Sequence, residues 1–280
     1  MERKKILLVI STVILVSMTI LGCDNRITAS TLETDIDHKN PSNIVDLSSW
    51  KLQLPIAGNN GKVVEEILPS TLQDGYSNSQ YFYVDDSSDA ITMRCVVNGA
   101  KTSNTKYSRT ELREMIGSKS TDNWGLGGTH ILNTTESVEA VSSTGKIVVA
   151  QIHGIYADGT NGPVLVKIMY DYSANGVWAM VKDKTGEDGK DSKSIFSGIE
   201  LGQKFDTQIK CKDGTAYITI SSNGRSELFS YNFLQNDSTW NDYLYYFKVG
   251  NYLLDDEEDY SGESAIVKVY RIDTDHDSKE

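Results

Sequence analysis

Proline, histidine and basic side chains are scarce in this chain, and each shortage excludes a class of protein. With only four prolines beside 22 glycines, the chain is neither collagen-like nor a proline-rich repeat. The four histidines (His38, His130, His153 and His276) lack the spacing of metal ligands, so a metal hydrolase is not expected. Lys and Arg number 27 against 39 Asp and Glu. The resulting net charge of −12 argues against a general binder of nucleic acid or anionic membranes.

Two common catalytic motifs are missing as well. The sequence has no glycine-rich phosphate loop and no Gly-x-Ser-x-Gly elbow. The acidic run 255–259 could bind calcium, but it lacks a glycine-punctuated calcium loop and is interpreted as a solvated loop. We therefore expect no cofactor and no metal. A hydrophobic fraction of 39% over 280 residues still provides for a real core.

The amino terminus is typical of an export signal. Residues 3–5 are basic, and residues 6–21 are almost wholly apolar, a run short for a membrane span but suited to a signal peptide. Gly22 before Cys23 resembles a bacterial lipobox. We expect a lipoprotein signal peptide over 1–22 and a lipid anchor at Cys23 as the only membrane contact. The alternative is an uncleaved anchor, and either interpretation places the domain on the cell surface or in the periplasm.

The rest of the chain divides by composition. Residues 23–43 are polar and predict a tether, residues 44–273 predict one domain, and residues 274–280 predict an acidic tail. An exported domain can form disulfides. Cys95 and Cys211 alternate with apolar residues in predicted strands, so a bridge and two buried free thiols both remain open.

Short runs with period-two alternation predict an all-β fold. Asn175-Gly176 and Asn223-Gly224 separate such runs as tight hairpin turns, and residues 182–193 predict a mobile polar loop. We predict a single-domain β-sandwich of jelly-roll type, acting as a monomer, with a concave groove for an extended ligand. The predicted strands are 90–97, 108–115, 146–153, 164–172, 177–181, 208–210, 216–221, 244–253 and 264–272.

The first chemically informative strand contains a row of charges. Tyr107, Arg109, Glu111 and Arg113 occupy alternate positions and share one face. Two guanidiniums held by a carboxylate suit bidentate binding of another carboxylate. The alternative is an exposed strand with ordinary ion pairs.

The second strand ends in an amide and an imidazole. Gln151 and His153 share a face, while Ile152 points to the core. Such a pair can polarise one group and accept a proton from another. The alternative is a hydrogen-bonded structural histidine.

The third strand combines aromatic side chains with a lysine. Tyr246, Lys248, Gly250 and Tyr252 fall on one face, and we expect Gly250 to leave open space for a ligand. The alternative is an ordinary aromatic strand of a sandwich.

If the three polar faces line one groove, that groove is cationic although the protein is acidic. Residues 255–280 alone hold ten acidic against three basic side chains, so net charge describes the tail and exterior. The groove suits a sugar chain that bears carboxylates.

These segments resemble a known family. Arg109-Thr-Glu-Leu-Arg113, Gln151-Ile-His153 and Tyr246-Phe-Lys-Val-Gly-Asn-Tyr252 resemble, in order, the three signature motifs of alginate lyases of polysaccharide lyase family 7. Residues 50–55 resemble the opening strand of that family, and the resemblance extends over residues 44–272. Val249 stands where Ala is more common. Leu254 stands where Gln is common, which affects one substrate subsite.

The resemblance implies a catalytic domain that cleaves 4-O-linked uronates by β-elimination into unsaturated oligosaccharides. Arg109 and Gln151 would neutralise the substrate carboxylate so that the C5 proton can leave, and Tyr252 would protonate the leaving O4. For guluronate the base would be His153. For mannuronate Tyr252 would be both base and acid, which requires cationic neighbours to lower its pKa.

The resemblance also implies residues that hold the polymer. Arg113, Lys248 and Tyr246 would bind neighbouring sugars, and Glu111 would orient the arginines. The central Ile152 is associated in this family with acceptance of guluronate-containing blocks. Two other functions remain open, namely a lyase on another polyuronate such as glucuronan and a non-catalytic glycan-binding lipoprotein.

Overall fold

Strands with one buried face build this protein. A computed structural model describes residues 40–59, 63–85, 88–103, 105–117 and 122–277. In β11 (Phe205–Lys212) buried side chains alternate with more exposed ones, and β12 (Thr215–Ser222) repeats the pattern. One buried face for each strand is what two packed antiparallel sheets require.

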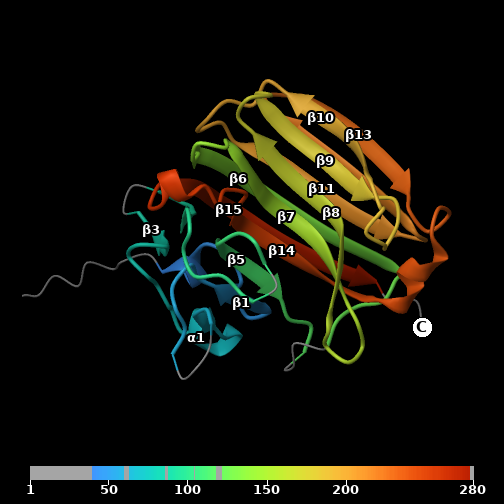
Figure 1. The fold of residues 1–280 in the computed structure, drawn as a ribbon, viewed down its shortest axis with the longest axis horizontal. Coiled ribbons are helices and arrows are strands. Elements are labelled where there is room, and N and C mark those ends of the chain that lie inside the picture. The colour runs from blue at the N-terminus through green and yellow to red at the C-terminus, as the bar shows by residue number, and fades with distance from the viewer. Residues whose placement is uncertain (1–39, 60–62, 86–87, 104, 118–121, 278–280) are drawn as a thin grey trace, which may run out of the picture. The chain divides into compact units, whose positions relative to one another are not determined.

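Eight strands form a sheet that we call the inner sheet, and it contains all three motif strands (Figure 1). β14 is hydrogen-bonded to β7 on one side and β5 on the other, so the last motif in the chain lies between the first two. In spatial order the inner strands are β10 (Asp191–Ser197), β9 (Gly176–Lys182), β8 (Asn161–Asp171), β7 (Lys146–Ile155), β14 (Leu244–Leu253), β5 (Arg109–Glu114), β1 (Trp50–Gln53) and β2 (Glu66–Ile67).

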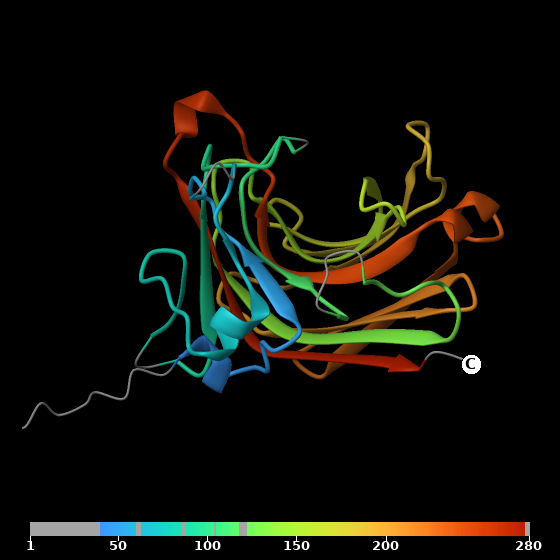
Figure 2. The same ribbon diagram turned by 90° about the horizontal axis from the view of Figure 1, so that it is seen from below.

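Seven strands form the outer sheet, over which the inner sheet curves (Figure 2). In spatial order they are β13 (Arg225–Asn232), β12, β11, β6 (Thr129–Ala140), β15 (Ser264–Asp277), β4 (Ile91–Val96) and β3 (Phe82–Val84). The helical elements of the described residues are short: η1 (Pro41–Asn43), α1 (Pro69–Gln73), η2 (Ser238–Asp242) and η3 (Glu258–Tyr260).

The hydrophobic core lies between the two sheets. Val166 and Phe247 of the inner sheet and Leu132 and Ile209 of the outer sheet are fully buried in one cluster. Each such side chain contributes about 1.5–3 kcal/mol relative to an exposed one. The described residues all fall in one compact unit, and the predicted all-β jelly-roll sandwich is confirmed.

The structure moves three predicted boundaries. β15 continues to Asp277, so residues 274–277 belong to the sheet and not to an acidic tail. Pro41, predicted in the tether, is buried in the domain. The loop predicted over 182–193 is shorter, because Asp191 already begins β10. Residues 1–39, which include the predicted signal peptide and Cys23, lie outside the described residues.

The two remaining cysteines are free and buried. Cys95 lies on β4 and Cys211 on β11, and β15 and β6 separate these strands. Three strand spacings amount to about 14 Å, twice the Cα separation that a disulfide tolerates. Burial raises the pKa of each thiol to about 12, so both are inert at neutral pH.

Candidate active site

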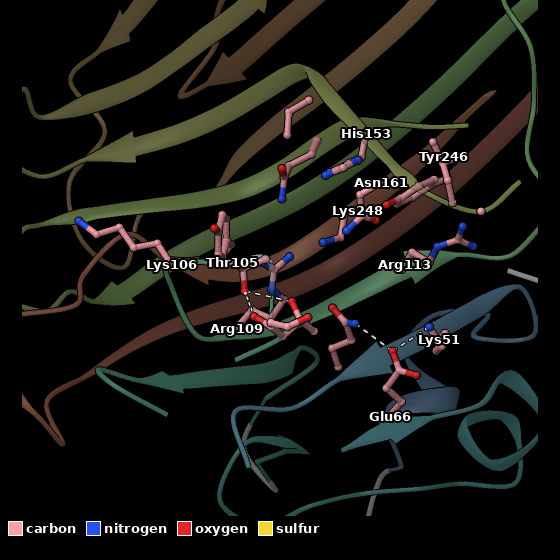
Figure 3. Close-up of a pocket in the computed structure, with 18 residues that line it drawn as sticks. Lys51, Glu66, Thr105, Lys106, Arg109, Arg113, His153, Asn161, Tyr246 and Lys248 are labelled. Atoms are coloured by element: carbon pink, nitrogen blue, oxygen red, sulfur yellow. Dashed lines mark hydrogen bonds and ion pairs between the residues drawn. The ribbon is translucent and has the colours of Figure 1, made fainter. Parts of the chain in front are cut away.

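A cavity of about 460 Å³ opens on the inner sheet and brings the three motifs together (Figure 3). Of the eight predicted catalytic and substrate-binding residues, seven line it: Arg109, Arg113, Gln151, His153, Tyr246, Lys248 and Tyr252. The eighth, Glu111, is buried beneath them and contacts three of them.

Strand register explains why these side chains meet. Lys248 of β14 lies directly opposite Arg113 of β5 and Gln151 of β7. Tyr246 lies opposite His153, and Tyr252 opposite Arg109. Directly opposed residues of antiparallel strands share a face, so the predicted shared face is confirmed for these side chains.

Glu111 joins the three strands through its carboxylate. One oxygen accepts hydrogen bonds from Arg109 Nη1, at 3.0 Å, and from Lys248 Nζ. The other accepts from Gln151 Nε2. Burial acts to raise the pKa of Glu111, but the charges of Lys248 and Arg109 outweigh it and lower that pKa. An ionised Glu111 therefore fixes the donors that the substrate carboxylate would meet, because a guanidinium and an amide keep further N–H groups.

Lys248 is buried at the centre of this group. Burial lowers its pKa to about 8, and the positive charge of Arg109 acts in the same direction. The ion pair with Glu111 opposes both effects. Lys248 is thus protonated at neutral pH, and it adds a positive charge to the groove.

His153 has one defined tautomer. Its Nδ1 lies 2.8 Å from the carbonyl oxygen of Gly154, which only accepts hydrogen bonds, so Nδ1 carries the proton. Nε2 then has the lone pair. Burial, followed by the charge of Lys248, lowers the pKa of His153 to about 4, so the ring is neutral at physiological pH. A partly exposed neutral imidazole with a free nitrogen is equipped to act as a base.

Tyr246 lies between His153 and Arg113. The rings of Tyr246 and His153 are stacked, with centroids 5.4 Å apart, and the Arg113 guanidinium lies 3.9 Å from the Tyr246 centroid. Arg113 donates to the Glu114 carbonyl at 2.7 Å and to Asn123 Oδ1 at 2.9 Å. Arg113 therefore positions the ring that supports His153, in addition to lining the cavity.

Tyr252 is a proton donor at neutral pH. Burial raises its pKa, and the opposing effect of Arg109 is smaller although the guanidinium lies 4.1 Å from the ring centroid. The lowered pKa that a tyrosine base requires is thus not present. A protonated phenol and a neutral imidazole in one cavity give the site an acid and a base on separate side chains.

The interpretation of Gly250 as an opening for the ligand is wrong. A Cβ there would meet Met93 Cε at 2.6 Å and the Thr110 carbonyl at 2.7 Å. Its φ of 139° also falls in the region that favours glycine. Gly250 allows β14 to pack against β5 and the core at a bulge, and it does not line the cavity.

Sequence reasoning missed one wall of the cavity. Lys51 and Gln53 of β1 and Glu66 of β2 line it, and the Glu66 carboxylate accepts hydrogen bonds from both, at 2.8 and 2.9 Å. Asn161 at the start of β8 also faces the cavity. The signal was present in the alternation of residues 50–53, which places Lys51 and Gln53 on one face.

Other sites have less support in the described part of the chain. No cluster of three or more His, Cys, Asp or Glu residues there could hold a metal ion. Asp255, from the acidic run, accepts hydrogen bonds from Ser142 and Ser143 and so fixes a loop. Among the same residues, no helix has the length and apolar character to cross a membrane.

The site can perform acid–base chemistry on an anionic polymer, and comparisons with known proteins agree. The family model described as alginate lyase matches residues 45–276, so the chain belongs to the alginate lyase family. An alginate lyase from Klebsiella pneumoniae is 32% identical over 143 residues, or 40% of this chain and 46% of that protein. The match thus spans about half the length of this curated relative.

Solved structures resemble the chain over most of its length. Alginate lyase A1-II', a member of polysaccharide lyase family 7, has a TM-score of 0.77 and 40% identity, covering 86% of this chain and 100% of that one. A form of the same lyase with a histidine and a tyrosine replaced, in complex with substrate (GGMG), has a TM-score of 0.77 and 39% identity. That match covers 86% of this chain and 98% of the other.

Proposed function

We propose that this protein is an alginate lyase that cleaves its substrate by β-elimination. One observation carries the proposal: the neutral His153, with its lone pair on Nε2, shares a groove with the protonated Tyr252. The donors held by Glu111 lie on the same face. A glycan-binding protein without activity would not need an acid and a base in this arrangement.

The reaction assigns one task to each group. Arg109 and Gln151 donate hydrogen bonds to the C6 carboxylate of the sugar, which stabilises the enolate-like intermediate. His153 Nε2 takes the C5 proton. The C4–O4 bond then breaks, its electron pair leaves with O4, and O4 receives the proton of Tyr252. One product is a fragment whose new reducing end carries the released hydroxyl group. The other begins with a sugar that has a C4=C5 double bond, and no water is added.

The separate acid and base favour guluronate at the cleaved position. In guluronate the C5 proton lies opposite O4, so two groups that act from opposite sides of the sugar ring are needed. In mannuronate both lie on one side, and the raised pKa of Tyr252 disfavours a single tyrosine as base. The A1-II' structures with GGMG and GGG add support for guluronate-containing blocks.

Ultraviolet absorbance of the unsaturated uronate tests the proposal directly. The wild type should give a signal on guluronate-rich alginate larger than on mannuronate-rich alginate, and glucuronan should give little. Absence of a signal on all alginates would refute the assignment. Tyr252→Phe should lower turnover about 10²–10⁴-fold with much of the binding retained. A fully active variant would refute the assigned acid.

The location of the enzyme is a second part of the proposal and rests on the sequence. Gly22 and Cys23 follow an apolar run at a lipobox-like boundary, so we infer lipidation of Cys23 after export. The mature protein should incorporate labelled palmitate and fractionate with membranes. Cys23→Ser should abolish the labelling. Labelling that persists in this variant would contradict the inference.

A further inference from the structure

The inner sheet continues from β8, whose first residues line the catalytic cavity, to β9 and β10 (Figure 1). Val177 and Ala179 of β9 are buried in the core, so Trp178 and Met180 project from the opposite, groove-lining face. Register connects this face to the site in two cross-strand rows. The rows are Lys248–Gln151–Lys167–Met180–Lys193 and Tyr252–Val148–Met169–Trp178–Ile195.

Trp178 therefore lies in the same row as the proposed acid. Three strand spacings separate it from Tyr252, or about 14 Å. The cavity itself runs in this direction, because Gln53 of β1, Arg109 of β5 and His153 of β7 line it in succession. A chain that lies along the cavity and continues past β7 passes over β8 and then Trp178.

The side chains around Trp178 combine an aromatic surface with cations. Its indole is partly exposed, and Lys193 Nζ lies 4.9 Å from the ring centroid. Lys167, beside Gln151, pairs with Asp191 at 2.8 Å. A uronate offers an apolar ring face and a carboxylate, which an indole and an ammonium complement respectively.

We propose that Trp178 and Lys193 form an accessory subsite that binds uronate units of the same polymer several sugars from the cleaved bond. Trp178 stacks on a sugar ring, and Lys193 moves from the indole to the sugar carboxylate. The inference rests on the proposed alginate specificity of the catalytic groove. The subsite predicts that the enzyme cleaves long chains more efficiently than short ones, a difference that the catalytic residues do not explain.

Chain-length dependence tests this subsite. Trp178→Ala should lower kcat/KM on polymeric guluronate about tenfold, the scale of one lost stacking and cation–π contact. The loss should be clearly smaller on a guluronate trisaccharide, because at most two of its sugars lie on one side of the cleaved bond, too few to cover the roughly 14 Å from Tyr252 to Trp178. Trp178→Phe should recover part of the activity on polymer. Tyr217→Ala, which removes a partly exposed aromatic from the outer sheet, is the matched control.

Two kinetic outcomes would overturn the subsite. Equal losses on polymer and trisaccharide would show a purely structural role, and an unchanged rate on polymer would show that Trp178 does not bind the substrate. Retardation in gels that contain alginate gives a readout independent of catalysis, and Trp178→Ala should migrate faster than the wild type. If the wild type has no lyase activity, the proposed function fails, and equal retardation of the two proteins would separately refute the subsite.

Discussion

The imidazole of His153 is oriented by the backbone of the next residue, because its Nδ1 donates a 2.8 Å hydrogen bond to the Gly154 carbonyl. This contact fixes which nitrogen is free, and the stack on Tyr246 fixes the plane of the ring. The base is therefore positioned before substrate arrives. Since the carbonyl belongs to the same strand, no movement of another element disturbs the tautomer.

Acid tolerance follows from the low pKa of His153. Burial lowers this pKa to about 4 from the ordinary 6.5, so the base stays unprotonated as the pH falls through 6.5. On soluble oligoguluronates, kcat/KM should decline only as the pH approaches about 4. Proton NMR of the His153 ring should report the same midpoint. A midpoint near 6.5 would contradict the assigned environment.

The lowered pKa of His153 also makes the stability of the folded protein depend on pH. Between pH 4 and 6.5 the unfolded chain binds a proton at this histidine and the folded protein does not. The contribution of His153 to stability is therefore complete above pH 6.5 and is lost as the pH falls toward 4. His153→Gln should reduce the acid sensitivity of Tm in this window. An unchanged slope in this variant would contradict the linkage.

An alkaline limit is expected from Lys248. Its pKa is lowered to about 8, so above this pH Glu111 loses a counter-charge and the groove loses a cation. The kcat/KM of the wild type should fall with a midpoint near 8. Tyr252 does not account for this limit, since its pKa is raised. Lys248→Arg keeps the charge at high pH and should move the limit upward, even if its rate is lower; an unmoved limit would contradict the assignment.

Removing the charge of Glu111 should affect both stability and rate. Glu111→Gln leaves the buried Lys248 and the partly buried Arg109 without their shared carboxylate, at a cost of roughly 3–5 kcal/mol in unfolding free energy. We also expect kcat/KM to fall about 10²–10³-fold, because the donors to the substrate carboxylate lose their support. Glu66→Gln at the more exposed pair with Lys51 should destabilise by much less. Equal destabilisation would show that Glu111 is not the central anchor.

The faces of the site residues could be predicted from the sequence where polar and apolar residues alternate regularly along a strand. In β5, β7 and β14 the polar residues of the site occupy one parity, so their shared faces could be predicted. The contacts of Glu111 with Lys248 and Gln151 could not, because they depend on β14 lying between β5 and β7, and sheet order is not a local property. β6 was missed because its buried face includes His130 and Glu136, which disguise the hydrophobic pattern. β13 was missed because, as an edge strand, it buries little.

Residues 274–277, predicted as part of an acidic tail, make a structural contact that their composition did not indicate. Along the end of β15, Asp273, Asp275 and Asp277 face solvent at alternate positions, while His276 turns inward. His276 Nε2 lies 2.7 Å from Glu114 Oε1, and the other Glu114 oxygen accepts from the backbone N–H of Phe247 at 3.0 Å. Through Glu114, the C-terminal strand β15 is thus linked to the backbone of Phe247 in β14, the residue between Tyr246 and Lys248.

Loss of this contact should weaken the domain. His276→Ala removes one partner of a buried carboxylate and should lower the unfolding free energy by about 1–3 kcal/mol. Deletion of residues 274–280 should cost at least as much, because it also removes the last four residue pairs between β15 and β6. Thermal denaturation of both variants measures the effect, with the exposed Asp275→Ala on the same strand as control. If the deletion variant is as stable as the wild type, these residues do not contribute to the stability of the domain. If Asp275→Ala loses as much stability as His276→Ala, the effect belongs to the strand and not to the His276 side chain.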